Sequence, residues 1–156
     1  MPGRVDRRLE ELGIIIPRAQ KPRVAKIKGS AVIGTTLYIS GMIPQWEGEV
    51  RYVGKVGEDF SIDEGREAAR LSALNVIAQA GEALNGDLDR IRQIAKVSGF
   101  VNCAPHVTEV AAVVNGASEL FMEIFGQRGA HARVAVGATT MPLGVAVEIE
   151  AIMEIE

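Results

Sequence analysis

The sequence has few of the side chains around which many proteins are built: one cysteine, two histidines and 4% aromatic residues. A lone cysteine, Cys103, cannot form a disulfide within the chain, so nothing indicates an oxidising compartment. The charged N-terminus, MPGRVDRRLEELG, lacks an apolar segment of signal-peptide length. No apolar run approaches the ~20 residues that a membrane helix needs. We therefore expect a soluble, cytoplasmic protein that does not contact membranes.

The scarcity of aromatic side chains and the charge balance both argue against nucleic acid as a partner. The chain has 17 Lys and Arg against 20 Asp and Glu, which gives a formal charge of −3. Nucleic-acid-binding domains usually carry a net basic footprint, and single strands stack on aromatic platforms. Two short basic alternations, at residues 26–29 and 92–96, are more typical of solvated strand faces. We expect no nucleic-acid partner.

Motifs for metals and cofactors are missing as well. There is no HExxH and no CxxC, and the two histidines, His106 and His131, lie far apart in the sequence. No glycine-rich phosphate-binding motif follows an expected strand. Cys103 has no evident base near it, which favours a buried, inert thiol over a nucleophile. We predict neither a metal site nor a cofactor.

The sequence does contain clear hydrophobic patterning in its first part. Residues 4–12 place apolar side chains at helical spacing, and residues 14–22, with two prolines, predict an extended connector. Together they would form an N-terminal helical extension over about 1–22. Residues 24–44 predict β-strands separated by glycines. The stretch 45–60 predicts a long loop with room for a short ribbon.

The strongest local signal is a helix that begins after Ser61. Ser61 and Glu64 fit a capping box, in which the serine hydroxyl accepts from the first turn and the glutamate reaches back. Apolar residues then recur at helical spacing to about Ala83. The following Asn-Gly pair ends this predicted helix.

The second half of the chain alternates strand and helix. Residues 91–102 predict a strand, residues 107–126 a second long helix, and residues 132–138 and 145–156 two further strands. In the last strand the apolar side chains share one face and the glutamates the other. We predict an α+β fold for residues 1–156 as a single domain, with two helices covering one face of a mixed sheet.

The uncovered face of this sheet is the part of the prediction that bears on function. If the last two strands form a hairpin, that face carries an arginine, two carboxylates and several very small residues. These residues are Arg133, Ala135, Gly137, Ala146, Glu148 and Glu150. Small side chains there suggest that another backbone packs closely against the sheet. We therefore expect an oligomer that closes over this side.

Two of these side chains could do chemistry. The Arg133 guanidinium can hold a carboxylate bidentately, and the Glu148 carboxylate could orient a water or accept its proton. For each side chain there is also a purely structural interpretation, and sequence spacing alone favours that interpretation. Arg133 could pair across strands with Glu150 or Glu148, and Glu148 could simply face solvent. Both interpretations stay open at this point.

The C-terminal block ARVAVGATTMPLGVAVEIEAIMEI resembles the signature of the RidA/YjgF family of enamine/imine deaminases. That signature is an arginine strand, a Leu/Met-Pro turn and an alternating strand with Glu-Ile-Glu-Ala. LYISGMIP, the GFVN strand and VVNGASELFMEIFG also resemble family segments and follow in family order. The resemblance covers residues 24–156, and the chain looks like one of the longer, less characterised branches.

The resemblance implies a chorismate-mutase-like fold, assembled as a homotrimer with sites in clefts between subunits. In deaminase members the arginine that matches Arg133 grips the substrate carboxylate. The glutamate that matches Glu148 helps to position the hydrolytic water. Asn115 matches an asparagine that lines the cleft, and the backbone at Ser40 and Gly41 matches another wall.

The chemistry implied by the resemblance is hydrolysis of a reactive imine. An enamine such as 2-aminoacrylate tautomerises to an imine, water adds to the imine carbon, and ammonia leaves to give a 2-keto acid. The partner would be a small metabolite that carries a carboxylate. One arginine and one carboxylate suffice for this through orientation and charge, so no cofactor is implied.

Two positions depart from the family pattern and keep alternatives open. Ile27 stands where the family has a cleft tyrosine, and Ala135 stands in the pocket where many members have a cysteine. A more apolar pocket fits a larger or less polar substrate. It also fits a non-catalytic, metabolite-binding or regulatory trimer. RNA cleavage, which has been attached to some members, is disfavoured by the acidic balance and the few aromatics.

Overall fold

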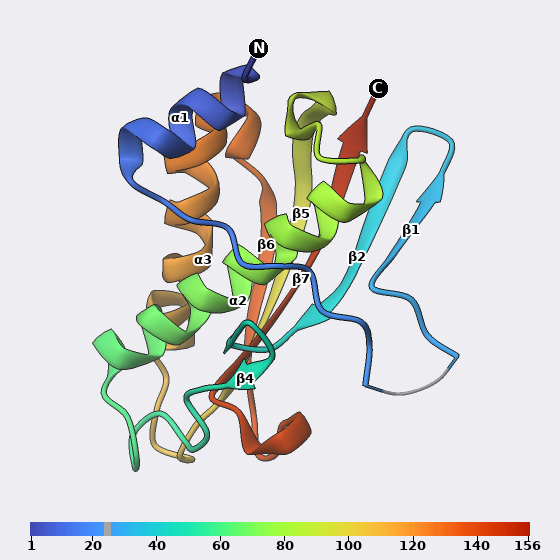
Figure 1. The fold of residues 1–156 in the computed structure, drawn as a ribbon. Coiled ribbons are helices and arrows are strands. Elements are labelled where there is room, and N and C mark those ends of the chain that lie inside the picture. The colour runs from blue at the N-terminus through green and yellow to red at the C-terminus, as the bar shows by residue number, and fades with distance from the viewer. Residues whose placement is uncertain (24–25) are drawn as a thin grey trace.

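The computed structural model describes residues 1–23 and 26–156, and its main sheet has five strands in the order β1-β2-β7-β5-β6. The helices α2 and α3 lie side by side on one face of this sheet, and α1 lies beside α3 (Figure 1). The elements in chain order are α1 (Arg4–Leu12), β1 (Ser30–Ile33), β2 (Thr36–Met42), β3 (Gln45–Trp46), β4 (Glu49–Val50), α2 (Ile62–Ala83), β5 (Ile91–Asn102), α3 (Val110–Phe125), β6 (Ala132–Ala138) and β7 (Val147–Ile155). This is the predicted α+β arrangement.

The N-terminal helix has the predicted bounds, and the rest of the molecule holds it in place. The Asp89 carboxylate accepts hydrogen bonds from the backbone N–H groups of Arg4 and Val5, at 2.6 and 2.9 Å. These are donors that the first turn of a helix leaves unpaired. Gly13, with φ +64°, ends the helix in the left-handed conformation.

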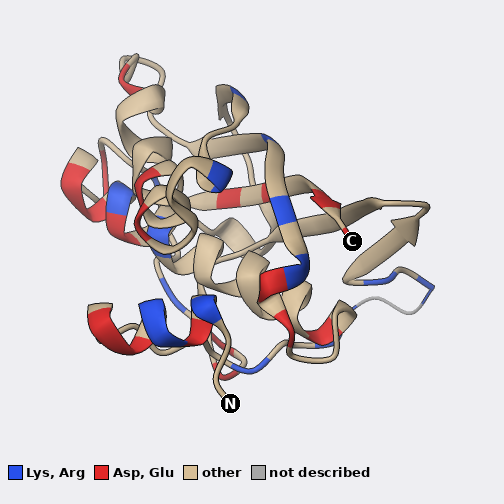
Figure 2. Ribbon diagram, turned by 90° about the horizontal axis from the view of Figure 1, so that it is seen from above, with Lys and Arg blue, Asp and Glu red and all other residues tan. Residues whose placement is uncertain are grey.

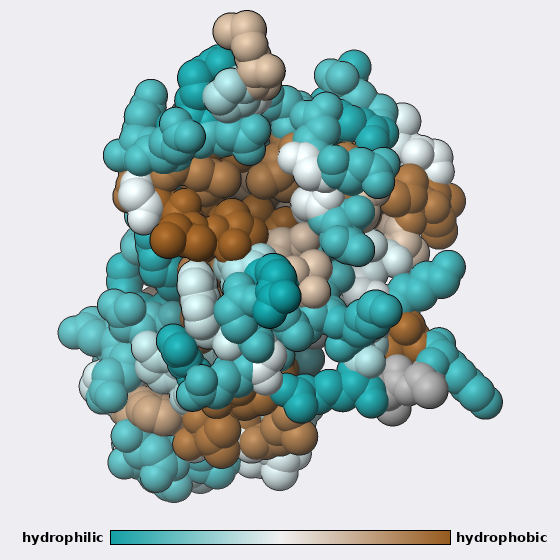
Figure 3. Space-filling view, viewed as in Figure 1, coloured by the Kyte–Doolittle hydropathy of each residue, from teal (hydrophilic) through white to brown (hydrophobic). Residues whose placement is uncertain are grey.

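The chain between α1 and β1 differs in part from the prediction. Three consecutive isoleucines begin the connector, and apolar atoms gather where it crosses from α1 toward α2 (Figure 3). Gln79 of α2 donates to the carbonyl of Gln20 at 2.7 Å and so holds the connector against the helix. The predicted strand over residues 24–29 is wrong at residues 26–29, which form none, and residues 24 and 25 lie outside the described residues.

Helix α2 begins with the predicted capping box. The Ser61 hydroxyl accepts from the backbone N–H of Glu64, and the Glu64 carboxylate accepts from that of Ser61, both at 3.1 Å. Small residues let α2 and α3 approach closely. A Cβ atom on Gly116 of α3 would overlap the backbone carbonyl of Arg66 in α2. The two helices therefore form one rigid layer over the sheet.

The predicted C-terminal hairpin is wrong. β6 pairs in parallel with β5 at the edge of the sheet, and β7 lies between β2 and β5, antiparallel to both. The unit β5–α3–β6 is a crossover, which places its second strand parallel to the first. The turn at Pro142–Gly144 then precedes β7 on the far side of β5.

This pairing moves Arg133 to the other side of the sheet. Arg133 lies opposite Val97, which is buried beneath the helices, whereas Glu148 lies opposite Phe100 on the uncovered face. The prediction that Arg133 and Glu148 share one face is therefore wrong. The helix-facing set is Arg133, Ala135 and Gly137, and the open-face set is Glu148 and Glu150, with Ala146 buried just before β7. The open face instead presents the valines of β6.

Within residues 1–23 and 26–156, no helix combines the length and the apolarity that crossing a membrane requires.

Candidate functional site

Arg133 lies on the edge strand β6 and reaches across to α3. Its Nη1 donates to the Asn115 side-chain oxygen at 2.7 Å and to the Ser118 hydroxyl at 3.2 Å. The structure thus brings together Arg133 and Asn115, two of the residues that the sequence predicts for the site. A cross-strand ion pair of Arg133 with Glu148 or Glu150 does not form in one chain, because these carboxylates lie on the opposite face.

Among the described residues, the hydrogen bonds of Arg133 leave one edge of its guanidinium without an acceptor. A guanidinium has five N–H donors, and both hydrogens of Nη1 are used by Asn115 and Ser118. In the part of the chain that the structure describes, no acceptor reaches Nε or Nη2, and the side chain is exposed. This edge has the fork geometry that binds a carboxylate bidentately.

Ser118 is also bonded to His131. Nε2 of His131 lies 2.9 Å from the Ser118 hydroxyl, and Nδ1 lies 2.6 Å from the carbonyl oxygen of Gly129. Burial lowers the pKa of the His131 imidazole, the bond to Gly129 raises it, and the charge of Arg133 lowers it further. The neutral ring is therefore the favoured form near pH 7.

Neither Ser118 nor His131 is among the site residues predicted from the sequence, although the spacing contains a signal for both. Ser118 follows Asn115 by three residues, which puts both on one side of a helix. His131 precedes Arg133 by two residues, which puts both on one face of an extended segment. These spacings indicate a contact between Ser118 and His131 only once the position of β6 beside α3 is known.

Glu148 has quite different surroundings. It is half-buried on the open face, and its carboxylate lies against Gly41: a Cβ atom on Gly41 would be 2.6 Å from Oε1. Burial raises the pKa of the Glu148 carboxyl, and the negative charge of Glu150 raises it further. Among the described residues, no side chain or backbone N–H donates to this carboxylate. It is therefore a stronger base than an ordinary glutamate.

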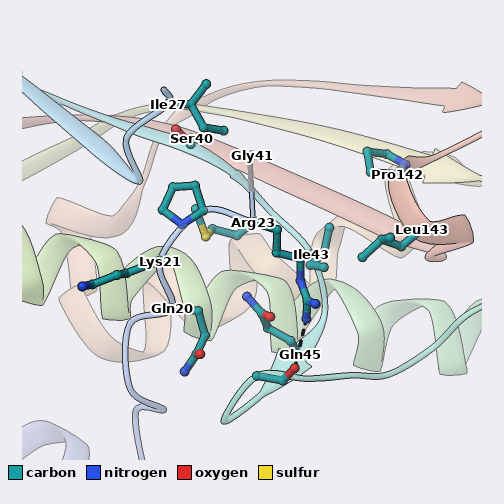
Figure 4. Close-up of a pocket in the computed structure, with 13 residues that line it drawn as sticks. Gln20, Lys21, Arg23, Ile27, Ser40, Gly41, Ile43, Gln45, Pro142 and Leu143 are labelled. Atoms are coloured by element: carbon teal, nitrogen blue, oxygen red, sulfur yellow. Dashed lines mark hydrogen bonds between the residues drawn. The ribbon is translucent and has the colours of Figure 1, made fainter. Parts of the chain in front are cut away.

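A cavity of about 550 Å³ opens beside Gly41, between the connector, the end of β2 and the Pro142–Leu143 turn (Figure 4). Ser40 and Gly41, for which the resemblance predicts a wall of the cleft, line this cavity. The Ser40 hydroxyl donates to the carbonyl of Lys28 at 2.5 Å, which fixes the wall to the connector. This volume is that of a typical small-molecule site.

The lining of the cavity is mainly apolar, with positive charge at one margin. Ile27 and Leu143 expose 57% and 58% of their surface, and Ile43 and Pro142 lie near them. Arg23 enters from the connector and donates to the carbonyl of Gly48 at 3.0 Å. Ile27, which the resemblance matches to the family's tyrosine, is thus part of the cavity wall.

The predicted site residues fall into two groups. Arg133 and Asn115 lie together on the helical side, where Ala135 is half-buried and packs against the core. Ser40, Gly41 and Glu148 lie together on the neighbouring strands β2 and β7. Each group is assembled by one chain, and one chain does not bring the two groups together. Among the described residues no three His, Cys, Asp or Glu side chains are grouped as a metal site would require.

Comparison with known proteins identifies the family. The family model described as "YjgF/chorismate mutase-like, putative endoribonuclease" matches residues 7–154. The chain belongs to this YjgF family. It is similar to Protein TCP17 of Trypanosoma cruzi, with 40% identity over 154 residues that span 98% of this chain and 95% of the relative. The resemblance seen in the sequence is therefore confirmed.

Solved structures agree with this YjgF assignment. The chain is similar to the protein Atu1372 of Agrobacterium tumefaciens, with a TM-score of 0.89 and 40% identity over 97% of this chain and 94% of that one. It is also similar to a "putative endoribonuclease" of Shewanella oneidensis, with a TM-score of 0.93 and 32% identity over 98% of this chain and 100% of that one. These matches confirm the chorismate-mutase-like fold.

Proposed function

We propose that this YjgF-family protein hydrolyses reactive 2-imino acids to 2-keto acids and ammonia. One observation carries the proposal: Arg133 is anchored through Nη1, while no acceptor among the described residues reaches its exposed Nε and Nη2 edge. A guanidinium held in this way suits the carboxylate of an acidic metabolite. The carboxylate lies next to the imine carbon in such a substrate, so binding it also places the reacting atom.

The reaction needs a base beside the imine carbon, and Glu148 supplies it. Its carboxylate accepts a proton from water as the oxygen adds to the imine carbon, and returns that proton to the imine nitrogen, which gives a carbinolamine. The carboxylate then takes the hydroxyl proton of the carbinolamine and passes it to the amino nitrogen, and ammonia leaves as the carbonyl forms. The balance is imine plus water to keto acid plus ammonia. The raised pKa of Glu148 favours both transfers.

Two copies of the chain are needed to put both groups on one substrate. Arg133 and Glu148 lie on opposite faces of the sheet, so the proposed cleft joins β6 of one copy to the open face of the next. The homotrimer that the family resemblance implies provides such a closed arrangement. Tyr38, Val134 and Val136 on that face expose 42%, 41% and 41% of their surface, and a neighbouring copy would cover them.

The cavity beside Gly41 would take the side chain of the substrate. Gly41 contacts Glu148 on one side and lines the cavity on the other, so the cavity adjoins the reacting carbon. Its walls at Ile27 and Leu143 favour an apolar side chain over a polar one. We therefore expect imines of leucine or methionine to be better substrates than 2-aminoacrylate.

A second candidate is a metabolite-binding trimer without turnover. It is favoured by Ile27, which stands in the cavity wall in place of a hydroxyl-bearing side chain. Cleavage of RNA, the activity named for some relatives, has less support. His106 precedes α3 and His131 follows it, so the sequence does not provide a neighbouring pair of histidines for acid–base cleavage of RNA. Acidic and basic residues are interspersed over the helical layer, which gives no continuous basic surface among its described residues (Figure 2).

The deciding experiment is a coupled assay in which an amino-acid oxidase generates imines in situ. The protein should accelerate keto-acid and ammonia formation above the uncatalysed rate, most strongly for leucine and methionine. No acceleration for any amino acid would reject the deaminase. In that event a calorimetric titration with the 2-keto acid of leucine identifies the binding module, and an RNA substrate in parallel tests nuclease activity.

A further inference from the structure

Two side chains outside those assigned by the family resemblance form a chain of hydrogen bonds that ends on Arg133. His131 is bonded to Ser118, and Ser118 to the Nη1 of Arg133. We propose that Ser118 and His131 are positioning residues, which fix the Arg133 guanidinium so that its Nε and Nη2 edge faces the substrate carboxylate. This inference rests on the proposed function, because it specifies how that site holds its substrate.

The direction of the chain follows from the chemistry of its ends. The Gly129 carbonyl can only accept, so Nδ1 of His131 carries a proton, at 2.6 Å. In the neutral ring Nε2 is then an acceptor and takes the Ser118 O–H hydrogen. The lone pairs of the Ser118 oxygen are left for Arg133. Each donor in the chain thus meets an acceptor.

The second acceptor on Nη1 is what orients the guanidinium. With Asn115 alone, Arg133 would be held at one point and could pivot about that bond. Ser118 takes the other Nη1 hydrogen and therefore fixes the plane of the group. Asn115 and Ser118 both project from α3, which packs on the sheet.

His131 is itself held from the core. Its ring lies edge-on to Phe121, with centroids 5.9 Å apart, and Phe121 is fully buried. Gly129, whose carbonyl bonds His131, packs so closely on the end of α3 that a Cβ atom would overlap the Phe121 carbonyl. The packing of His131 on α3 therefore restrains the Ser118 hydroxyl, and the hydroxyl in turn restrains the Arg133 guanidinium.

A role in stability alone would also explain these bonds, so the test must measure ligand binding. We expect Ser118→Ala to raise the KM for the imine and the Kd for the 2-keto acid of leucine about three- to tenfold, with kcat little changed. Ser118→Thr keeps the hydroxyl and should bind like the wild type. A matched thermal melt of each variant reports folding separately.

A double-mutant cycle tests whether His131 acts through Ser118. His131→Ala should weaken binding in the same way as Ser118→Ala, and the double variant should be no weaker than Ser118→Ala alone. If the two losses instead multiply, His131 does not act through the hydroxyl. A Kd for Ser118→Ala equal to that of the wild type would refute the positioning role.

Histidine NMR provides a readout that a structural role would not change. The charge of Arg133 lowers the pKa of His131, so a bound carboxylate should raise it by offsetting that charge. A pKa of His131 that stays constant at saturating keto acid contradicts the inference. If the wild type neither binds keto acid nor turns over imines, the proposed function fails together with it.

Discussion

The two halves of the candidate site differ in how firmly they are held. On the helical side Arg133 belongs to a network with Asn115, Ser118 and His131. On the open face Glu148 rests against Gly41, and no donor among the described residues fixes it. A cation that must bind a carboxylate gains from a fixed orientation. A base gains from the absence of donors, because hydrogen bonds to its charged form would lower its pKa.

Removing the Arg133 guanidinium should reduce activity more than any other change to the site. Arg133→Ala removes two charge-assisted hydrogen bonds to the substrate and should lower kcat/KM for the imine about 100-fold. Arg133→Lys keeps the charge without the fork and should recover only part of that loss. Arg92→Ala, at an exposed arginine of β5, is the matched control and should leave the kinetics unchanged. An Arg133→Ala enzyme with wild-type kinetics would remove the basis of the proposal.

On the open face, adding one methyl group at Gly41 is enough to displace the Glu148 carboxylate. Gly41→Ala places a Cβ atom 2.6 Å from the Glu148 carboxylate, so this side chain must move away from residue 41. We expect kcat to fall about tenfold, within the usual range for losing a positioned acid or base. Gly81→Ala in α2, where a Cβ meets nothing closer than 3.9 Å, is the control. Unchanged kcat in Gly41→Ala would mean that Glu148 does not act from this position.

Substitutions in the cavity wall are expected to change substrate specificity more than the reaction rate. Leu143→Ser makes the exposed wall polar and should reduce the preference for leucine over alanine imines about fivefold, because apolar pockets discriminate by a few kcal/mol at most. Val32→Ser changes another exposed apolar residue, on β1, and should have no such effect. The ratio of the two kcat/KM values decides the outcome, and an unchanged ratio excludes the cavity as the side-chain pocket.

The smallest expected effect concerns pH. Glu148 must be ionised to accept a proton from water, so activity should rise with pH through its pKa. Glu150 raises that pKa, and Glu150→Gln should therefore shift the rising limb of kcat toward lower pH. Glu154→Gln, farther along β7, is the control. A shift toward higher pH would contradict the assignment of Glu148 as the base.

Local signals predicted most of the secondary structure because they depend on neighbours in the chain. Residues 4–12 and 91–102 have the predicted bounds, and Ser61 caps its helix as the motif indicates. Capping boxes and apolar periodicity act over a few residues, so they can be read directly from the sequence. The family resemblance assigned both Arg133 and Asn115 to the cleft, and the structure shows them hydrogen-bonded to each other.

Strand partners could not be read in the same way. The predicted hairpin paired the two last strands because they are adjacent in sequence, yet β5 separates them in the sheet. Since side chains alternate along a strand, the parallel register with β5 put Arg133 on the helical face. His131 and Ser118 were missed for the same reason. Their contact exists only once β6 lies along α3.

The central claim is that Arg133 of one copy and Glu148 of another act on one substrate, and mixing two inactive variants tests it most directly. Arg133→Ala and Glu148→Gln proteins, unfolded together and refolded as an equal mixture, would form cyclic assemblies in which about a quarter of the clefts have both residues intact. Imine hydrolysis should return to about that fraction of the wild-type rate. If the mixture stays as inactive as each variant alone, although exchange of subunits is demonstrated, the shared cleft does not exist.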